Sequence, residues 1–177
     1  MSNRTVLQVA DVEADRWYER ILDFCAARCP KFSFVTRTMV RYMLTPKALS
    51  FFDEAKPYVE LEQLQSSWPG GGVVGPGDPN TVTYLTTSGG SIGLLKRRSK
   101  SPFDWVHFDL PEDLAFYRPD GSPFFVVIGH ERVAYFDASE SEREELECAI
   151  PDIIFSSVGK IVLNMDDDEL PPEAPRS

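Results

Sequence analysis

The stretch between Trp68 and Asn80 limits the fold of this chain more than any other part of the sequence. It contains five glycines and three prolines, a composition that neither a regular helix nor a central strand tolerates. We therefore predict a Gly/Pro loop at 68–80 that is mobile and has no regular structure. This loop is expected to separate a helical part, at about 1–67, from a β-rich part at 81–165.

The same loop contains the spacing G-x-G-x-x-G, at Gly70, Gly72 and Gly75. A phosphate-binding loop of this type follows a strand and leads into the N-terminus of a helix, whose backbone N–H groups bind the phosphate. Pro69 cannot donate to a preceding strand ladder, and Pro76 crowds the place where the helix would begin. The sequence therefore predicts no dinucleotide site, and no cofactor is expected.

An apolar stripe with helical spacing lies near the N-terminus. Trp17, Ile21 and Cys25 repeat every four residues, and Asp11 is a suitable N-cap. Pro30 ends this helix, because the residue before a proline is driven out of the helical region.

Residues 31–44 fit a strand and a helix equally well. A second helix is predicted to begin with Thr45 as its N-cap and Pro46 at the first helical position. A short further helix is expected at 58–67. The residues predicted to form the buried face of the second helix are Leu49, Phe52 and Ala55.

The β-rich part contains several turn signals. Ser88-Gly89-Gly90 separates two strand-like runs and predicts a hairpin, and residues 104–110 alternate like a half-buried strand. Turns at 118–121 and 129–132 divide the following residues into a three-stranded meander.

These elements predict an α+β fold, in which N-terminal helices pack on a mostly antiparallel sheet and an acidic helix comes last. Ser139 and Glu142 form the S-x-x-E capping box of that helix. A single globular domain at 1–165 agrees with the 42% of hydrophobic residues, which suffices for a core at this length. Residues 166–177 are expected to form an acidic, disordered tail.

The formal net charge of the chain is −10. Such a field repels nucleic acid and anionic membranes and attracts basic proteins. The one dense basic cluster, Lys96–Lys100, is a small electrostatic footprint in so acidic a chain, so nucleic acid is not an expected partner. No apolar run is long enough to span a membrane, and three cysteines without a secretory signal fit the reducing cytoplasm.

Two motifs suggest a metal site, and neither is complete. The motif that starts at His130 resembles H-E-x-x-H, but Ala134 stands where the second histidine is required. Cys25 and Cys29 share one helix face, but a structural zinc site needs four ligands. We therefore predict no metal site and expect both cysteines in the core.

The sequence contains no complete catalytic motif, so the favoured hypothesis is a protein without chemistry of its own. We expect a small acidic cytoplasmic binding protein that docks on a basic partner protein, for instance an inhibitor or immunity-type protein that neutralises a toxin or nuclease. The residues expected to bind the partner are the glutamates of the acidic helix and one aromatic residue: Glu140, Glu142, Glu144, Glu145, Glu147 and Trp105.

The alternative hypothesis is a small enzyme or ligand-binding protein with a site between the helices and the sheet. Trp105, His107 and Asp109 are expected on one face of the strand at 104–110. Because histidine titrates near neutral pH, His107 with Asp109 would be the candidate catalytic pair.

Overall fold

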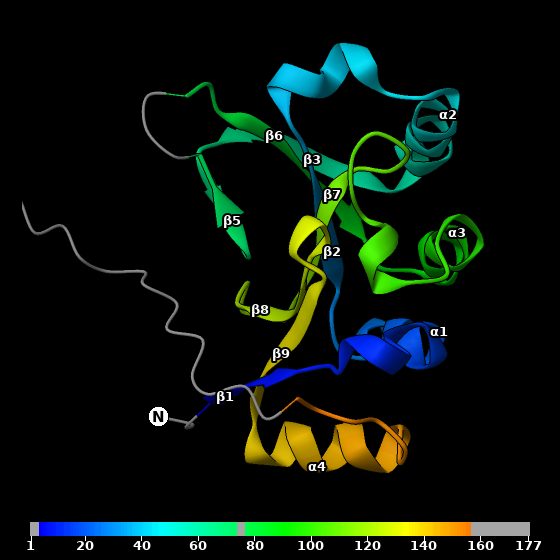
Figure 1. Cartoon of the computed structure of the whole chain (residues 1–177), viewed down its shortest axis with the longest axis vertical. Coiled ribbons are helices and arrows are strands. Elements are labelled where there is room, and N and C mark those ends of the chain that lie inside the picture. Colours follow the sequence, from blue (N-terminus) through cyan, green and yellow to red (C-terminus); the bar gives the residue numbers. More distant parts are fainter. Residues whose placement is uncertain (1–3, 74–76, 157–177) are drawn as a thin grey trace, which may run out of the picture.

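The computed structural model describes residues 4–73 and 77–156, and its centre is a seven-stranded sheet (Figure 1). Every neighbouring pair of its strands is antiparallel. The strands in sheet order are β1 (Arg4–Gln8), β9 (Val133–Ser139), β8 (Pro123–Ile128), β7 (Glu112–Tyr117), β2 (Lys31–Thr36), β6 (Asn80–Thr86) and β3 (Val59–Gln65). The fold is therefore a mixture of helices and an antiparallel sheet, as the α+β prediction requires.

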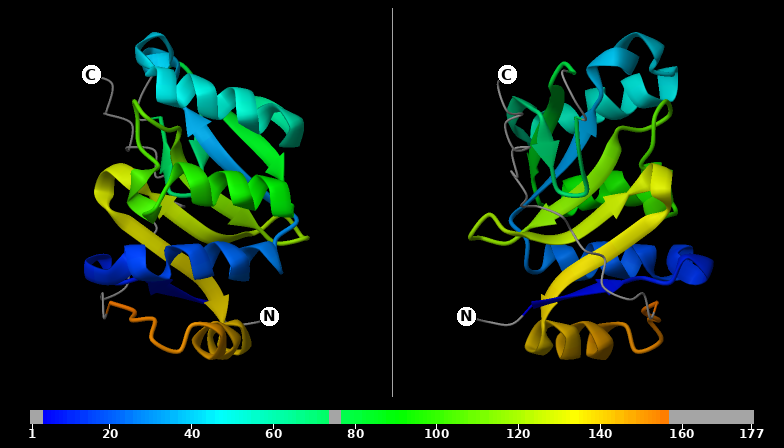
Figure 2. Two further views of the ribbon diagram at one scale, coloured as in Figure 1. Left: turned by 90° about the vertical axis from the view of Figure 1, so that its right-hand side faces the viewer. Right: turned by 60° about the vertical axis from the view of Figure 1, so that its left-hand side comes forward.

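Three helices, α1, α2 and α3, lie side by side on one face of this sheet, and α4 lies across the end where β1 is found (Figures 1 and 2). The helices are α1 (Ala14–Ala26), α2 (Pro46–Ala55), α3 (Gly89–Arg98) and α4 (Glu140–Ala149). Short 3-10 turns connect them to the strands: η1 (Asp11–Glu13), η2 (Thr38–Met43), η3 (Lys56–Tyr58), η4 (Pro102–Asp104) and η5 (Gly129–Glu131).

The main core lies between the three helices and the sheet. It contains fully buried aromatic side chains from helices and strands, among them Trp17, Phe34, Phe51 and Phe116. Trp105 is also fully buried in this core, where its Nε1 donates a hydrogen bond to the Tyr18 hydroxyl at 2.6 Å. This bond satisfies the one polar atom that burial of an indole would otherwise leave without a partner.

The basic cluster at the end of α3 pairs with acidic side chains of the neighbouring helices. Lys96 pairs with Asp23 of α1 at 2.6 Å, and Arg98 pairs with Glu54 of α2. Exposed ion pairs of this kind contribute little stability each. They do show that the residues of this cluster contact α1 and α2 and not the acidic helix α4.

A two-stranded hairpin, β4 (Ser67–Trp68) and β5 (Gly71–Gly72), lies on the other face of the sheet (Figure 1). The sequence predicts a structureless loop here, but Trp68 is buried against Val35 and Val82. Gly70 has a φ of +86°, and a Cβ at this position would lie 2.9 Å from Ile128. A glycine therefore allows the turn to approach the sheet closely. The third glycine of the spacing, Gly75, lies outside the described residues.

The predicted division into a helical part and a β-rich part is wrong. β1, β2 and β3 lie within residues 1–67, and α3 lies within 81–165. The hairpin predicted at Ser88 is the start of α3, because Ser88 accepts a hydrogen bond from the Ser91 backbone and caps a helix. The residues predicted as a helix at 58–67 form β3, an edge strand in which six of seven residues are exposed.

The capping residue predicted for α2 is correct, and the one predicted for α1 is wrong. Thr45 caps α2, with Pro46 at its first position. Asp11 makes no capping hydrogen bond, and α1 begins at Ala14. In α2, Ala55 is buried as predicted, but the other buried residues, Ala48 and Phe51, lie one position before the predicted Leu49 and Phe52.

The meander at 112–139 is present as predicted, and Cys25 and Cys29 are buried, free thiols. Residues 104–110 do not form a strand, because η4 and a turn occupy this segment. Among the described residues, no helix combines the length and apolar character needed to cross a membrane. The predicted acidic tail at 166–177 lies outside the described residues.

Replacement of Trp105 tests the importance of this core. Trp105→Ala is expected to lower the free energy of unfolding by about 3–5 kcal/mol, the usual cost of truncating a buried aromatic residue. Urea denaturation followed by circular dichroism measures this change. If that variant does not fold, Trp105→Phe removes the hydrogen bond to Tyr18 and part of the buried ring volume, and should cost less than Trp105→Ala, about 1–3 kcal/mol.

Phe108→Ala is the matched control, because this side chain is 41% exposed. Its replacement is expected to cost less than about 1 kcal/mol. A Trp105→Ala variant as stable as the Phe108→Ala variant would contradict the position of Trp105 in the core.

Candidate functional site

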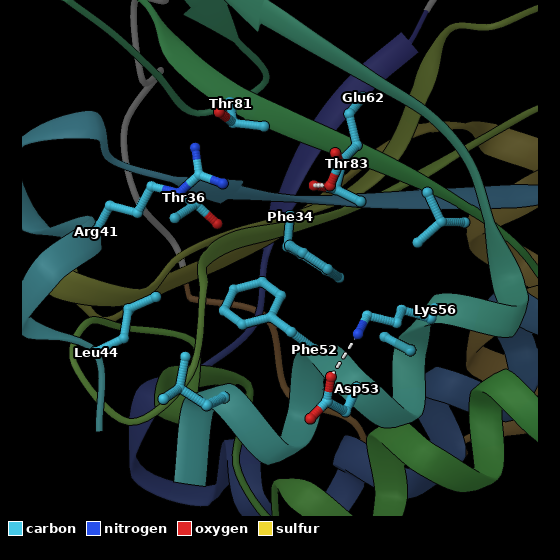
Figure 3. A pocket seen from close by; sticks show the side chains of 13 residues that line it. Phe34, Thr36, Arg41, Leu44, Phe52, Asp53, Lys56, Glu62, Thr81 and Thr83 are labelled. Carbon is cyan, nitrogen blue, oxygen red and sulfur yellow. Dashed lines mark hydrogen bonds and ion pairs between the residues drawn. The ribbon is translucent and has the colours of Figure 1, made fainter. Parts of the chain in front are cut away.

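An open groove of about 560 Å³ lies between α2 and the sheet (Figure 3). Its floor is apolar, with Phe34 of β2 beneath Phe52 of α2, and η2 and the residues after it form one wall. Asp53 and Lys56 pair with each other at 2.6 Å on the helix side. Arg41 also lines the groove and forms no ion pair with any described residue. Glu62 of β3 also lines the groove, accepts a hydrogen bond from the Thr83 hydroxyl and forms no ion pair with a described residue. The groove thus combines an apolar floor with one positive and one negative side chain that are not paired with each other.

Large apolar side chains are exposed on the elements that form this groove. Of the nine large hydrophobic residues exposed in the described part of the chain, seven come from η2, α2 and β3. Tyr42 and Met39 are 96% and 88% exposed, and η2 has no buried residue at all. We call the following six residues the apolar surface: Met39, Tyr42, Met43, Leu49, Val59 and Leu64.

The register of β3 assigns its apolar residues to two faces. Leu64 pairs with Thr81 and Val59 pairs with Leu85, so both face the helix side of the sheet, where Thr81 lines the groove. Leu61 pairs with Tyr84 and faces the opposite side, so it is not part of the apolar surface. Of the described strands, only β6 pairs with β3, which leaves the outer edge of β3 open.

A second group of functional side chains gathers at the start of β7. Glu112, Asp113 and His130 each offer a possible metal-ligand atom, and these atoms lie within 4.8 Å of one another. Glu112 forms an ion pair with Arg37, and Asp113 Oδ2 accepts a hydrogen bond from Trp68 Nε1 at 2.8 Å. Burial raises the pKa of the Asp113 carboxyl to about 6, against the opposing effect of that hydrogen bond.

His107 lies near this group, but its ring atoms are already engaged. Its Nε2 accepts a hydrogen bond from the Arg37 backbone N–H at 3.0 Å, and its Nδ1 lies 3.4 Å from the Leu110 carbonyl oxygen. This pattern fixes the neutral tautomer with the proton on Nδ1. Burial also lowers the pKa of His107, despite the nearby charge of Glu112. His107 therefore holds the backbone of Arg37 in place, and its lone pair is not free to accept a proton.

The structure does not place the predicted trio Trp105, His107 and Asp109 on one strand face. Trp105 is in the core and cannot contact a partner, because its side chain has no exposed surface. Asp109 accepts a hydrogen bond from the Thr45 hydroxyl at 2.9 Å and lies beside the start of α2. Neither His107 nor Asp109 lines the groove, so the groove and the predicted catalytic pair are separate.

The glutamates predicted to bind a partner lie on α4, at the end of the molecule opposite η2 (Figure 1). Three of them make ion pairs with arginines of the chain: Glu142 with Arg118, Glu145 with Arg28, and Glu147 with Arg143. Within the described residues, Glu140 and Glu144 form no such pair. Much of the acidic charge of α4 is thus compensated within the molecule.

Glu142 is the most firmly held of these residues. Its carboxylate accepts hydrogen bonds from Arg118 Nε at 2.8 Å and from the Ser139 backbone N–H at 2.8 Å. Partial burial alone would raise the pKa of Glu142, but these bonds lower it. The residue therefore joins α4 to Arg118, which also donates to the carbonyl oxygens of Pro123 and Asp137.

Sequence reasoning missed both the groove and the carboxylate cluster. The residues Met39, Tyr42 and Met43 of η2 are recognisable in the sequence as an apolar group. Such a group is equally typical of a buried helix face, so the sequence did not predict its exposure. The carboxylate cluster has no sequence signal, because Glu112 lies at the start of β7 and His130 lies in η5, the turn between β8 and β9.

Comparisons with known proteins identify no relative. No protein-family model matches this chain, and neither a curated protein nor a solved structure matches it significantly.

The role of Glu142 can be tested by stability measurements at several pH values. Glu142→Gln is expected to lower the free energy of unfolding by about 1–2 kcal/mol at pH 7, because a charged hydrogen bond to Arg118 is weakened. Since the folded-state pKa of Glu142 is lowered, this stabilisation is complete above the unfolded pKa, near 4.3, and disappears as the pH falls through the folded value.

The difference between the wild type and Glu142→Gln should therefore shrink on acidification below about pH 4. Glu144→Gln is the matched control, since Glu144 is exposed and forms no ion pair with a described residue. Equal effects of the two replacements, or a difference that does not depend on pH, would refute this role.

Proposed function

We propose that this chain is a binding protein that docks on a partner protein through the apolar surface around the groove. The observation that carries the proposal is the exposure of Tyr42 and Met39, at 96% and 88%, on a turn that contributes nothing to the core. Aromatic residues and methionine are enriched in protein interfaces, and neighbouring exposed apolar residues are typical of an interaction site.

The charge of the chain supports a basic protein as the partner. A net charge of −10 attracts a positively charged molecule over several ångströms before contact and so increases the rate of association. The acidic charge and the apolar surface would have separate roles in this proposal. Glu140 and Glu144 of α4 would contribute to the attraction, and the apolar surface would supply the contact area.

A specific form of this proposal is a cytoplasmic inhibitor or immunity-type protein that neutralises a basic toxin or nuclease. Its support is the combination of high acidic charge, an open apolar surface and the lack of a complete catalytic motif in the sequence. An inhibitor needs only a complementary surface and no chemistry of its own.

A second candidate function is the binding of a small molecule in the groove. The volume of about 560 Å³ falls within the range of roughly 300–1,000 Å³ that is usual for small-ligand sites. With Phe34 and Phe52 on its floor and the charged side chains Arg41 and Glu62 also lining it, the groove would suit a mainly apolar molecule with a few polar groups. The predicted pair His107 and Asp109 takes no part in this version.

Replacement of the two most exposed residues tests docking. The double variant Tyr42→Ser/Met39→Ser should fold as well as the wild type, because both side chains are almost fully exposed. We expect it to bind a basic partner, purified from the native host with the wild-type protein as bait, at least about 30-fold more weakly, as loss of about 2 kcal/mol at interface hot spots requires. Isothermal titration calorimetry with both purified proteins measures the change.

Ile154→Ser is the matched control, because Ile154 is a 53% exposed apolar residue outside the apolar surface. It should leave the affinity unchanged, and added salt should slow association with the wild type. If no basic protein binds the wild type, or if the double variant binds as tightly as Ile154→Ser, docking through this surface is refuted. Since Tyr42 and Met39 do not line the groove, small-ligand binding would survive the double replacement.

A further inference from the structure

An irregularity at the start of β7 brings two consecutive carboxylates to the same side of the sheet. In a regular strand, neighbours such as Glu112 and Asp113 would point to opposite faces. Here Ser33 pairs with Ala115 and Val35 pairs with Glu112, so β7 has one extra residue at this point. Asp113 has a φ of +55°, which reorients its side chain toward Trp68 on the hairpin side of the sheet.

One oxygen of Asp113 is left without a partner. Asp113 is only 1% exposed, and Oδ2 accepts the hydrogen bond from Trp68. Oδ1 is buried and makes no hydrogen bond. The backbone N–H of Gly129 is close enough to favour the charged carboxylate but makes no hydrogen bond of good geometry to it. A buried, unpartnered carboxylate oxygen is costly unless a proton or a cation occupies the position.

His130 completes the group from another part of the chain. It lies in η5, directly after Gly129, which packs so closely on η4 that a Cβ there would be 2.1 Å from the Trp105 carbonyl oxygen. This contact fixes the turn next to Asp113. The side chain of His130 is 46% exposed, so its ring can change rotamer without disturbing the core.

The charges in this group leave room for a cation. Arg37 pairs with Oε2 of Glu112 and compensates one carboxylate. His107 lies beside Arg37 as a neutral ring, since its Nε2 accepts the Arg37 backbone N–H. Within the described residues, no lysine or arginine pairs with Asp113. Two carboxylates with a single cationic partner would be balanced by a bound metal ion.

The geometry points to a divalent transition-metal site, with Zn²⁺ as its preferred ion, formed by Glu112, Asp113 and His130. One imidazole and two carboxylates are a ligand set suited to Zn²⁺, whereas Mg²⁺ and Ca²⁺ prefer oxygen alone. Bond lengths of about 2.0–2.2 Å place ligands on one Zn²⁺ roughly 3–4 Å apart. Since the ligand atoms already lie within 4.8 Å of one another, only a small closure of the site is needed, and the exposed ring of His130 can supply it.

Such a site needs no sequence motif, and it differs from the incomplete H-E-x-x-H at His130. The carboxylates of Glu112 and Asp113 replace the missing second histidine. Three protein ligands leave one tetrahedral position for water or for a group of another molecule. None of the three ligands lines the groove, so this site is independent of the docking proposed above.

Titration with Zn²⁺ tests the assignment directly. The full chain with Cys148→Ser is the reference, because the exposed thiol of Cys148 could bind zinc by itself. After treatment with a chelator, isothermal titration calorimetry at pH 7.5 should show one saturable Zn²⁺ per chain. Co²⁺ in place of Zn²⁺ should give visible d–d absorption bands with the same stoichiometry.

Two replacements of ligands and one control decide the outcome. Asp113→Asn keeps the hydrogen bond to Trp68 and tolerates the positive φ, and His130→Ala removes an exposed ring. Each should weaken Zn²⁺ binding more than about tenfold, since even outer partners of metal ligands change affinity by about 10- to 100-fold. Glu144→Gln, which removes an exposed carboxylate of α4 outside the cluster, should leave the affinity unchanged.

The site is refuted if the reference protein shows no saturable 1:1 binding. It is also refuted if Asp113→Asn and His130→Ala bind Zn²⁺ as tightly as Glu144→Gln, which would indicate binding elsewhere on this acidic chain. Equal affinity for Mg²⁺ and Zn²⁺ would overturn the assignment to a transition metal. Circular dichroism of each variant establishes that a loss of binding does not reflect unfolding.

Discussion

The rest of the structure depends on burial of one face of the seven-stranded sheet beneath α1, α2 and α3. The aromatic side chains of this face, such as Phe34 and Phe116, contact the helices over most of its area. Because apolar burial is the main stabilising contribution in folding, these helices cannot leave the sheet without loss of the core. The groove lies at the margin of that core, where residues of α2, η2 and the edge strand β3 line it.

Within residues 4–73 and 77–156, the opposite face of the sheet is covered much less completely. The short hairpin β4–β5 covers part of it, and Trp68 anchors the hairpin both by apolar contacts and by its hydrogen bond to Asp113. A second apolar cluster on this face, around Tyr117 and Val126, contains only a few residues. The hairpin therefore adds little to the core, and its main contribution is to hold the buried carboxylate of Asp113 at the start of β7.

The sequence predicted those elements whose signals are local. Thr45 caps a helix, and the turns of the meander lie where proline, glycine and polar residues predict them. The capping box that begins at Ser88 is also a local signal. The two glycines that follow Ser88 are more typical of a hairpin turn, and the sequence therefore predicted a hairpin there. β3 carries no such signal, because its pairing with β6 depends on residues 15 to 26 positions away. At an exposed edge, its alternation also separates no buried face from an exposed one.

The candidate sites were less predictable than the fold. The cluster of Glu112, Asp113 and His130 requires a bulge in β7, a positive φ at Asp113 and a turn that brings His130 close. No fixed spacing in the sequence indicates such a cluster. Trp105 and Tyr42 show the same limit for aromatic residues: each could be core or surface by composition, and only the path of the chain makes one fully buried and the other fully exposed.

The pairing of β1 with β9 also affects how the chain can fold during synthesis. Arg4 lies opposite Ser139, so β1 has no partner until the residues of β9 have also been made. Contacts between such distant residues form late and slow down folding. Until then Leu7 and Val9, both buried in the finished protein, remain in contact with water or with other proteins. The newly made chain should therefore depend on chaperones for longer than a protein of this size whose strands pair in order.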